Sequence, residues 1–148
     1  PNIGRTLTIK VAFSHHCYTE GFDADKHERK QIIVRDGSGP RVFCPIRHDL
    51  SFRLPQIVRS IPNNRVYQTA QQRNYVYAIP LDIKGQIYEV FFMLQNAERV
   101  AGIDLRMTIE SAYPVNAPLP LPKRPNAIRF TILAYKVLRR EPVRFAAR

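Results

Sequence analysis

The sequence predicts an α+β fold dominated by strands: one main helix, then an antiparallel meander of four to five strands, with additional N-terminal strands. In only one convincing segment do apolar residues recur at helical spacing. After that segment the apolar period changes from 3.6 to 2, as expected for half-buried strands. The 148 residues, 45% of them hydrophobic, are enough for a single domain, 1–148, with a substantial core.

The N-terminal part of the chain is predicted to hold short strands. Residues 5–13 (RTLTIKVAF) alternate apolar and polar side chains, which indicates a half-buried strand. The polar stretch 14–30 is predicted to be a loop. Short strands are expected over 31–34 and 41–45, with a strong turn signal, DGSGP, at 36–40 between them. These strands either extend the main sheet or form a second layer.

The predicted helix lies within 48–64 (HDLSFRLPQIVRSIPNN). Its apolar residues fall at helical spacing, namely Leu50, Leu54, Ile57, Val58 and Ile61. Pro55 suits only the first turn of a helix, and Pro62 ends the pattern. The secure helix is therefore 54–61, with a separate turn before it.

Strands with a period of two follow the helix. They are predicted over 66–69, 74–81, 86–95, 103–113 and 127–138. Lys84 and Gly85 mark a tight hairpin turn. In the strand 103–113, every second residue from Ile103 to Tyr113 is expected on one face. The strand 127–138 changes phase, which predicts a bulge near Ala134.

The positive charge is concentrated near the end of the sequence. The net charge is +11. Residues 1–122 carry 15 Lys+Arg against 11 Asp+Glu, whereas Glu141 is the one acidic residue among the basic residues that follow. Residues 114–125 (PVNAPLPLPKRP) are predicted to form an extended proline-rich connector to a basic C-terminal strand and tail. The predicted nucleic-acid contacts are Arg73, Lys123, Arg124, Arg129, Lys136, Arg139, Arg140 and Arg144. The alternatives are a solvated strand face or a patch covered by an acidic partner.

Several function classes are excluded by missing motifs. The sequence contains no Walker loop, GxGxxG, HExxH or GxSxG, which argues against nucleotide hydrolysis, Rossmann redox chemistry and zinc proteolysis. No apolar run is long enough for a membrane-spanning helix, so no membrane partner is expected. Two cysteines in 148 residues suggest a reducing, cytoplasmic setting. No cofactor is predicted.

Cysteine and histidine residues raise the question of zinc. They are His15, His16, Cys17, Cys44 and His48. Cys44 and His48 have a plausible local spacing for two ligands. However, adjacent residues such as His15 and His16 rarely point at one metal ion. We therefore predict no metal site, and the sequence leaves any metal role of these residues open.

A polar cluster at the helix entrance includes His48 and Arg53. A histidine beside Asp49 and arginines can act as a general acid or base, because its pKa lies near neutrality. The alternative is structural: Asp49 and Ser51 cap the helix, and the arginines are solvated.

A second polar group follows the predicted meander. It comprises Arg73, Tyr75, Tyr77, Tyr88, Glu89, Glu110, Ser111 and Tyr113. A basic sheet with such residues can bind RNA by stacking and phosphate contacts. It can also cleave RNA without metal, using a proton acceptor, a cation and a proton donor. The alternative is that tyrosine is a strand former and half of these residues belong to the core.

The order of elements resembles the small nuclease domains of the barnase–EndoU–colicin–RelE superfamily, which includes phage- and plasmid-associated toxins. The resemblance covers 47–113 and rests on LPQIVRSIPNN, NYVYAIPL, QIYEVFFMLQ and DLRMTIESAYPV, with Ser111-Ala112-Tyr113-Pro114 near the end. It implies a helix before a four-stranded antiparallel meander. It also implies metal-independent RNA cleavage and a toxin role with a neutralising antitoxin.

The resemblance also assigns residues. It implies that His48 or Arg53 holds the helix-side catalytic position and that Tyr75, Tyr88 or Glu89 lines the groove. It further implies that Ser111 and Tyr113 close the site. No histidine lies on the meander, so a RelE-like chemistry with arginine, lysine and tyrosine fits this composition better.

Three functions follow as hypotheses. The first is a metal-independent, RNA-cleaving toxin-type domain with catalytic residues His48, Arg53, Tyr75, Glu89, Ser111 and Tyr113. The second is a non-catalytic basic nucleic-acid-binding module, phage-encoded. The third is a structural protein that assembles through its proline-rich arm and strand edges. The corresponding partners are RNA or another nucleic acid, an acidic antitoxin or assembly partner, and a second copy of the chain.

Overall fold

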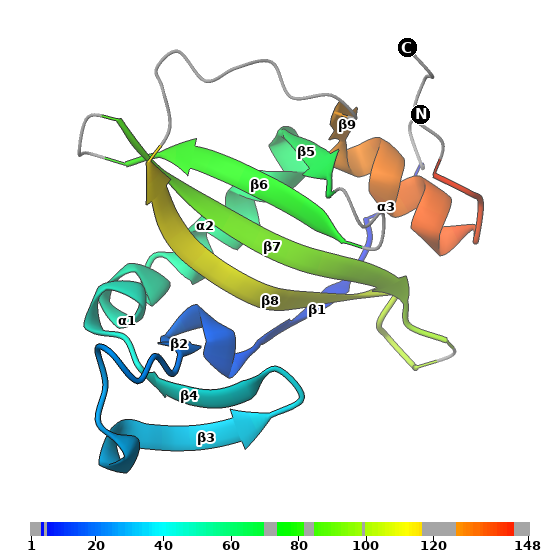
Figure 1. Ribbon diagram of the computed structural model, residues 1–148. Helices are drawn as coiled ribbons and strands as arrows, with labels where there is room; N and C mark the ends of the chain where they lie inside the picture. Colours follow the sequence, from blue (N-terminus) through cyan, green and yellow to red (C-terminus); the bar gives the residue numbers. More distant parts are fainter. Residues whose placement is uncertain are drawn as a thin grey trace.

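The computed structural model confirms the predicted fold class. It describes residue 4 and residues 6–69, 74–81, 85–98, 100–116 and 127–143. The fold is α+β and dominated by strands, with a six-stranded sheet and a separate three-stranded sheet (Figure 1). No helix within these residues is long and apolar enough to span a membrane.

The large sheet contains the predicted antiparallel meander. Its strands, in spatial order, are β1 (Ile9–Phe13), β8 (Leu105–Asn116), β7 (Gln86–Asn96), β6 (Tyr75–Pro80), β5 (Arg65–Gln68) and β9 (Ala127–Arg129). β5 to β8 pair antiparallel with their neighbours. β1 pairs parallel with β8 at one edge, and β9 pairs with β5 at the other. The sheet is therefore mixed, with the meander at its centre.

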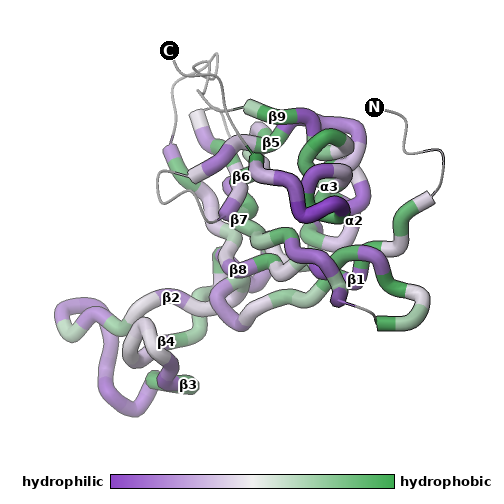
Figure 2. The backbone as a smooth tube through the Cα atoms, turned by 90° about the vertical axis from the view of Figure 1, so that its right-hand side faces the viewer, coloured by the Kyte–Doolittle hydropathy of each residue, from purple (hydrophilic) through white to green (hydrophobic). Residues whose placement is uncertain are grey.

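The small sheet is formed by β2 (Thr19–Gly21), β4 (Gly39–Phe43) and β3 (Ile32–Asp36), in that spatial order. β3 and β4 form a hairpin whose turn lies at the predicted DGSGP signal, where Gly39 has φ +105°. Figure 2 shows this sheet standing out from the body of the protein. Both alternatives for the N-terminal strands therefore occur, because β1 extends the main sheet and β2 to β4 form a second one.

The predicted loop 14–30 is more ordered than expected. It contains β2 and 3-10 turns at η1 (His15–Cys17) and η2 (Arg29–Gln31). η1 is held by its cap, since the Ser14 side chain accepts a hydrogen bond from the backbone N–H of His16. Cys17 is buried in the main core and anchors this turn to the body of the protein.

The predicted helix 54–61 is confirmed as α2 (Leu54–Ser60), followed by η3 (Ile61–Asn63). Pro55 lies in the first turn of α2, where a missing N–H is tolerated. α1 (Pro45–Ser51) precedes it as a separate short helix. Asp49 and Ser51 do not cap either helix: the N-cap residues are Cys44 and Arg53, and neither makes a side-chain capping bond.

The predicted strand over 127–138 is wrong beyond residue 129. Only β9 is a strand; α3 (Phe130–Leu138) follows it directly. Phe130, Leu133 and Ala134 are buried, and Val137 and Leu138 pack against the core. These positions follow helical spacing, so the phase change near Ala134 marks a helix rather than a bulge. The basic residues after it therefore lie at a helix end.

One face of the large sheet carries the core. α2 and α3 cover this face (Figure 1), Ile61 of η3 joins the same core, and Phe92 of β7 meets Phe130 of α3 with ring centroids 6.2 Å apart. Fully buried side chains from these elements include Leu54, Ile61, Val90, Ile109 and Leu133. The opposite face of β7 and β8 is left for other contacts.

A bulge in β8 changes which residues reach that opposite face. Ile109 pairs with Phe92, whereas Ser111 pairs with Phe91, so Glu110 is the extra residue. The predicted alternation holds from Leu105 to Ile109 and then inverts. Ala112 becomes buried, and Ser111 and Tyr113 turn away from the core.

The proline-rich connector begins later than predicted. Pro114 and the two residues after it belong to β8, because they pair with β7. The connector's remaining residues, 117–125, lie outside the described residues. Lys84 of the predicted hairpin turn also lies outside them, whereas Gly85 has φ +80° directly before β7.

Candidate functional site

A polar hollow of about 460 Å³ lies on the outer face of β7 and β8, beside η1. It is lined by Ser14, His16, Asn74, Phe91, Thr108, Glu110, Ser111 and Tyr113. The bulge at Glu110 is what brings Ser111 and Tyr113 to this face. The hollow thus combines aromatic, hydroxyl, carboxylate and imidazole groups from distant parts of the sequence.

Aromatic rings form one wall of the hollow. Phe91 and Tyr113 are stacked, with ring centroids 5.3 Å apart and an interplanar angle of 22°. The Arg47 guanidinium lies over the Tyr113 ring, 4.8 Å from its centroid. Burial raises the pKa of the Tyr113 hydroxyl, and the nearby Glu89 carboxylate raises it further.

Guanidinium groups converge behind this wall on Thr19. Arg47 Nη1 donates to the Thr19 carbonyl oxygen at 2.9 Å and to the His16 carbonyl oxygen at 3.3 Å. The buried Arg41 donates from Nε to Thr19 Oγ1 at 2.9 Å and from Nη2 to the same carbonyl at 3.0 Å. Burial lowers the pKa of Arg41, and the neighbouring Arg47 lowers it further. Positive charge is therefore fixed close to the hollow.

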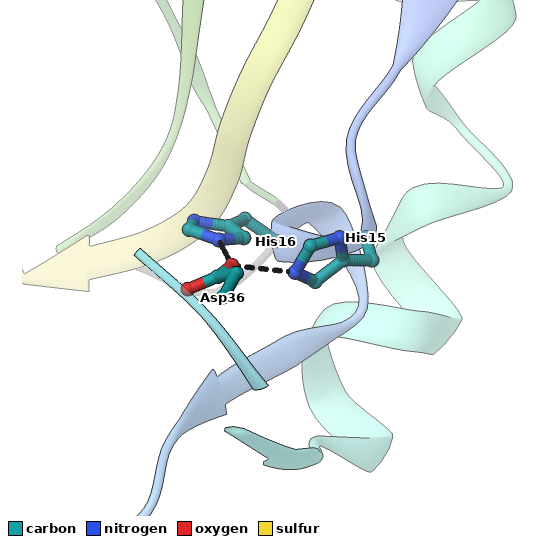
Figure 3. Close-up of side chains that lie close together, drawn as sticks. All are labelled: His15, His16 and Asp36. Atoms are coloured by element: carbon teal, nitrogen blue, oxygen red, sulfur yellow. Dashed lines mark hydrogen bonds and ion pairs between the residues drawn. The ribbon is translucent and has the colours of Figure 1, made fainter. Parts of the chain in front are cut away.

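An imidazole–carboxylate cluster stands at the η1 side of the hollow. His15 Nε2 and His16 Nε2 lie 2.8 and 2.6 Å from the same Asp36 oxygen, Oδ2 (Figure 3). The other oxygen, Oδ1, accepts from the Ser38 backbone N–H and hydroxyl, at 2.7 and 2.6 Å. These bonds, led by the Ser38 hydroxyl and then His16, hold the pKa of the Asp36 carboxyl well below its usual range.

A second carboxylate belongs to the hollow itself. Glu110 Oε2 accepts a hydrogen bond of 2.7 Å from Asn74 Nδ2. Thr69 Oγ1 in turn donates to Asn74 Oδ1. This chain positions Glu110 next to Ser111, so a carboxylate and a hydroxyl share the floor of the hollow.

The predicted catalytic residues are not all brought together. Ser111 and Tyr113 line the hollow, and Glu89 lies on the same face, opposite Tyr113 in the β7–β8 register. Tyr75 is 7% exposed and packs against Phe92 on the other, core face. Tyr75 and Tyr113 thus point to opposite sides of the sheet.

His48 and Arg53 also lie outside the lining of the hollow. The His48 ring is placed between Phe43 and Phe52, with centroids 5.1 and 4.9 Å away. Arg53 is the residue at the start of α2. His16, rather than His48, is the histidine that lines the hollow.

The basic residues predicted to contact nucleic acid are spread over the opposite end of the protein. Arg129 is exposed on β9, paired with Arg65 of β5. Lys136 and Arg139 lie on or next to the last turn of α3, and Arg139 Nε is 3.1 Å from Glu141. Arg140 lies 3.8 Å from Glu98. Arg73, Lys123, Arg124 and Arg144 lie outside the described residues.

A larger hollow, of about 820 Å³, lies at that end. Its charged lining residues are Arg106, Arg140, Glu98 and Glu141. Among the described residues that line it, two arginines are balanced by two glutamates. The smaller hollow, with its imidazole, carboxylate and hydroxyl groups, is the better candidate for chemistry.

Sequence reasoning missed Asp36; it weighed His16 only as a zinc ligand and Arg47 only as an arginine of the helix-entrance cluster. Asp36 begins the turn sequence DGSG, and a turn is a sufficient local reason for an aspartate at this position. Its second role, as the partner of two imidazoles, arises only in the folded chain. The two cysteines are free and buried, and neither joins the cluster. Burial raises the pKa of the Cys17 thiol to about 11.

Comparison with known proteins corrects the expected relationship. A family model described as the YjaZ family matches residues 2–138. The curated protein YjaZ of Escherichia coli (strain K12) is 26% identical over 131 residues, which cover 87% of this chain and 69% of that protein. No solved structure matches. The resemblance to the barnase–EndoU–colicin–RelE superfamily is therefore wrong, and the toxin role that it implied loses its support. The short motifs behind it reflect a helix followed by a meander, an order that unrelated folds share. The chain belongs to the YjaZ family.

Proposed function

We propose that the protein binds single-stranded RNA in the hollow between β7, β8 and η1. The observation that carries this proposal is the stacked pair Phe91–Tyr113 with the Arg47 guanidinium over it. A partly exposed aromatic wall beside a fixed cation is the arrangement that holds an unpaired base and its phosphate. The net charge of +11 adds a long-range attraction for an anionic ligand.

The pairing of the arginines favours Arg47, beside the hollow, over the cations of the C-terminal end. Arg139 is paired with Glu141, and Arg140 lies near Glu98, so these cations are already partly compensated. For Arg47, the described residues show carbonyl oxygens and an aromatic ring as partners, none of which carries a full negative charge. Its charge is therefore available to a phosphate.

Binding is tested by fluorescence anisotropy with a labelled oligouridine at two salt concentrations. We expect affinity that falls steeply with salt, because phosphate contacts release counterions. The Tyr113→Leu variant should bind roughly tenfold more weakly, since stacking on one base contributes about 1–3 kcal/mol. The matched control is Phe52→Leu, a 73% exposed aromatic outside the hollow, which should bind like the natural protein.

Equal binding by Tyr113→Leu and the natural protein would place the RNA elsewhere. If Arg129→Gln weakens binding instead, the β5–β9 edge is the nucleic-acid surface, and the proposal for the hollow fails. Both variants change exposed or partly exposed side chains, so circular dichroism should confirm an unchanged fold.

RNA cleavage is a second proposal for the same hollow. It is favoured by Glu110 and Ser111, which place a carboxylate and a hydroxyl beside the proposed phosphate position. Cleavage is tested by incubating the oligonucleotide with clean protein in EDTA, with Glu110→Gln as the variant. Product formed in EDTA and lost in Glu110→Gln supports metal-independent cleavage; intact RNA overturns it.

We place the protein in the cytoplasm, because free, buried cysteines suit a reducing compartment. Assembly through strand edges remains the alternative to RNA binding. It predicts a stable oligomer in light scattering and weak affinity for RNA.

A further inference from the structure

The geometry points to a divalent transition-metal site formed by His15, His16 and Asp36. Their ligand atoms, His15 Nε2, His16 Nε2 and a carboxylate oxygen of Asp36, lie within 4.8 Å of one another. Figure 3 shows both imidazoles turned towards the same carboxylate. Imidazole nitrogen with one carboxylate oxygen is a donor set suited to Zn²⁺ and to Co²⁺ in its place.

The η1 turn explains how adjacent histidines can serve one ion. The turn is fixed by hydrogen bonds from Cys17 N–H to the Ser14 carbonyl and from Tyr18 N–H to the His15 carbonyl, both 3.1 Å long. In this conformation the two imidazole rings are 4.7 Å apart and inclined by 70°. Both Nε2 atoms therefore face Asp36, which an extended strand would not permit because its successive side chains alternate.

Neighbouring groups hold the η1 backbone and the Asp36 carboxylate in place. Arg47 Nη1 donates to the His16 carbonyl oxygen, and buried Cys17 fixes the turn from below. The Ser38 backbone and hydroxyl hold Oδ1 of Asp36, which leaves Oδ2 directed at the imidazoles. Arg41 Nη1 is 3.4 Å from the Ser38 hydroxyl and extends this support. Such outer contacts commonly orient the ligands of metal sites.

The cluster is open enough to take up an ion. The side chains of His15, His16 and Asp36 are 31%, 26% and 23% exposed. In a tetrahedral site with ligand–metal distances of about 2.1 Å, donor atoms lie about 3.4 Å apart, so each imidazole would move away from Asp36 Oδ2 by somewhat less than about 1 Å. That adjustment is small for histidine side chains that are not packed in the core.

Three protein ligands leave a coordination position for water or a ligand. His16 also lines the hollow, so the ion would stand beside the proposed RNA site. A bound metal of this kind can polarise a phosphoryl oxygen or activate water. The metal site does not depend on RNA binding, and each can be tested without the other.

The test uses the full chain without a histidine tag, stripped with EDTA and titrated with Zn²⁺ by calorimetry. We expect one Zn²⁺ per chain. Asp36→Asn and His16→Gln should each weaken binding by more than about 100-fold, because each replaces a preferred Zn²⁺ ligand with a weakly coordinating amide. Ser38→Ala should weaken it by about 10- to 100-fold, because Ser38 only positions Asp36. The matched control is His48→Gln, a histidine outside the cluster, which should bind like the natural protein.

Spectroscopy on the natural protein covers the case in which a variant fails to fold. Co²⁺ bound at this site should give visible absorption bands without a thiolate charge-transfer band. A thiolate band would assign the ion to Cys17 or Cys44 and overturn the inference. The absence of Zn²⁺ binding would also overturn the inference, and so would equal Zn²⁺ affinities of His16→Gln and the His48→Gln control. The cluster would then be a hydrogen-bonded network only.

Discussion

His16 Nε2 lies 2.6 Å from Asp36 Oδ2, although the two residues are 20 positions apart in the sequence. The contact joins η1 to the end of β3, and thereby ties the small sheet to the edge of the hollow on β7 and β8. Arg47 reinforces the same junction from α1, through the carbonyl oxygens of His16 and Thr19. The candidate site is thus built where three parts of the chain meet.

Arg47→Ala should loosen this junction. The substitution removes two hydrogen bonds from a charged donor and the contact with the Tyr113 ring, so we expect a loss of about 1–3 kcal/mol in the free energy of unfolding. Urea denaturation measures the loss. Arg59→Ala on α2 is the control, with a change within about 0.5 kcal/mol. Equal stability of the Arg47 variant and the natural protein would mean that the guanidinium does not hold the junction.

Leu133→Ala tests the helix that replaces the predicted C-terminal strand. Leu133 is fully buried, so its truncation should lower the free energy of unfolding by about 2–5 kcal/mol. Thr131→Ala, on the exposed side of the same helix, should change it by less than about 0.5 kcal/mol. In a strand, residues 131 and 133 would face the same side, so similar losses at both positions would contradict the helix.

The two principal differences between sequence and structure have the same physical origin. From 127 to 138 the chain is rich in β-branched and aromatic residues, which favour a strand locally, but burial of Phe130, Leu133 and Ala134 against the sheet selects a helix. In β8, the bulge at Glu110 arises from pairing with β7. Neither the packing of α3 against the sheet nor the pairing of β8 with β7 can be read from the local periodicity of the sequence.

The sequence was sufficient for the fold class, the meander, the α2 helix and the DGSGP turn. For the site it identified Ser111, Tyr113 and Glu89 as neighbours on one part of the sheet. It could not identify Asp36 or His16 as partners, because β3 and η1 meet only in the folded chain. Tyr75 was grouped with Tyr113 although β6 and β8 direct these side chains to opposite faces.

Arg140→Gly should stabilise the end of α3. Arg140 has φ +57°, and the bonds from Arg140 N–H to Val137 O and from Glu141 N–H to Lys136 O form a Schellman motif. Glycine adopts this conformation without strain, so the melting temperature should rise, with a gain of about 0.5–1 kcal/mol. Arg139→Gly, where φ is −87°, should instead destabilise the helix end. A loss of stability in Arg140→Gly would show that its contact with Glu98 matters more than the backbone strain.

Stability should fall in alkaline solution because of Cys17. Its thiol has a pKa of about 11 in the folded protein, above its ordinary value of 9.0, because burial disfavours the thiolate. The unfolded chain therefore loses this proton first. The protonated Cys17 thiol contributes about 2 kcal/mol to the free energy of unfolding below pH 9. This contribution is lost as the pH rises to 11.

This effect is measured as the difference in urea denaturation between the natural protein and Cys17→Ala in EDTA, from pH 8 to 11. Lysine and tyrosine titration affects both proteins and cancels in the difference. A difference that does not change with pH would show that the Cys17 thiol ionises in the folded protein as easily as in the unfolded chain.

The most direct test of the central claim is a titration of the ¹⁵N-labelled protein with oligouridine, followed by NMR. RNA bound in the hollow should shift the amide signals of Phe91, Ser111 and Tyr113, and of His16 across the hollow, in a saturable and salt-dependent way. Shifts confined to β9 and the end of α3, with these four signals unmoved, would contradict the account.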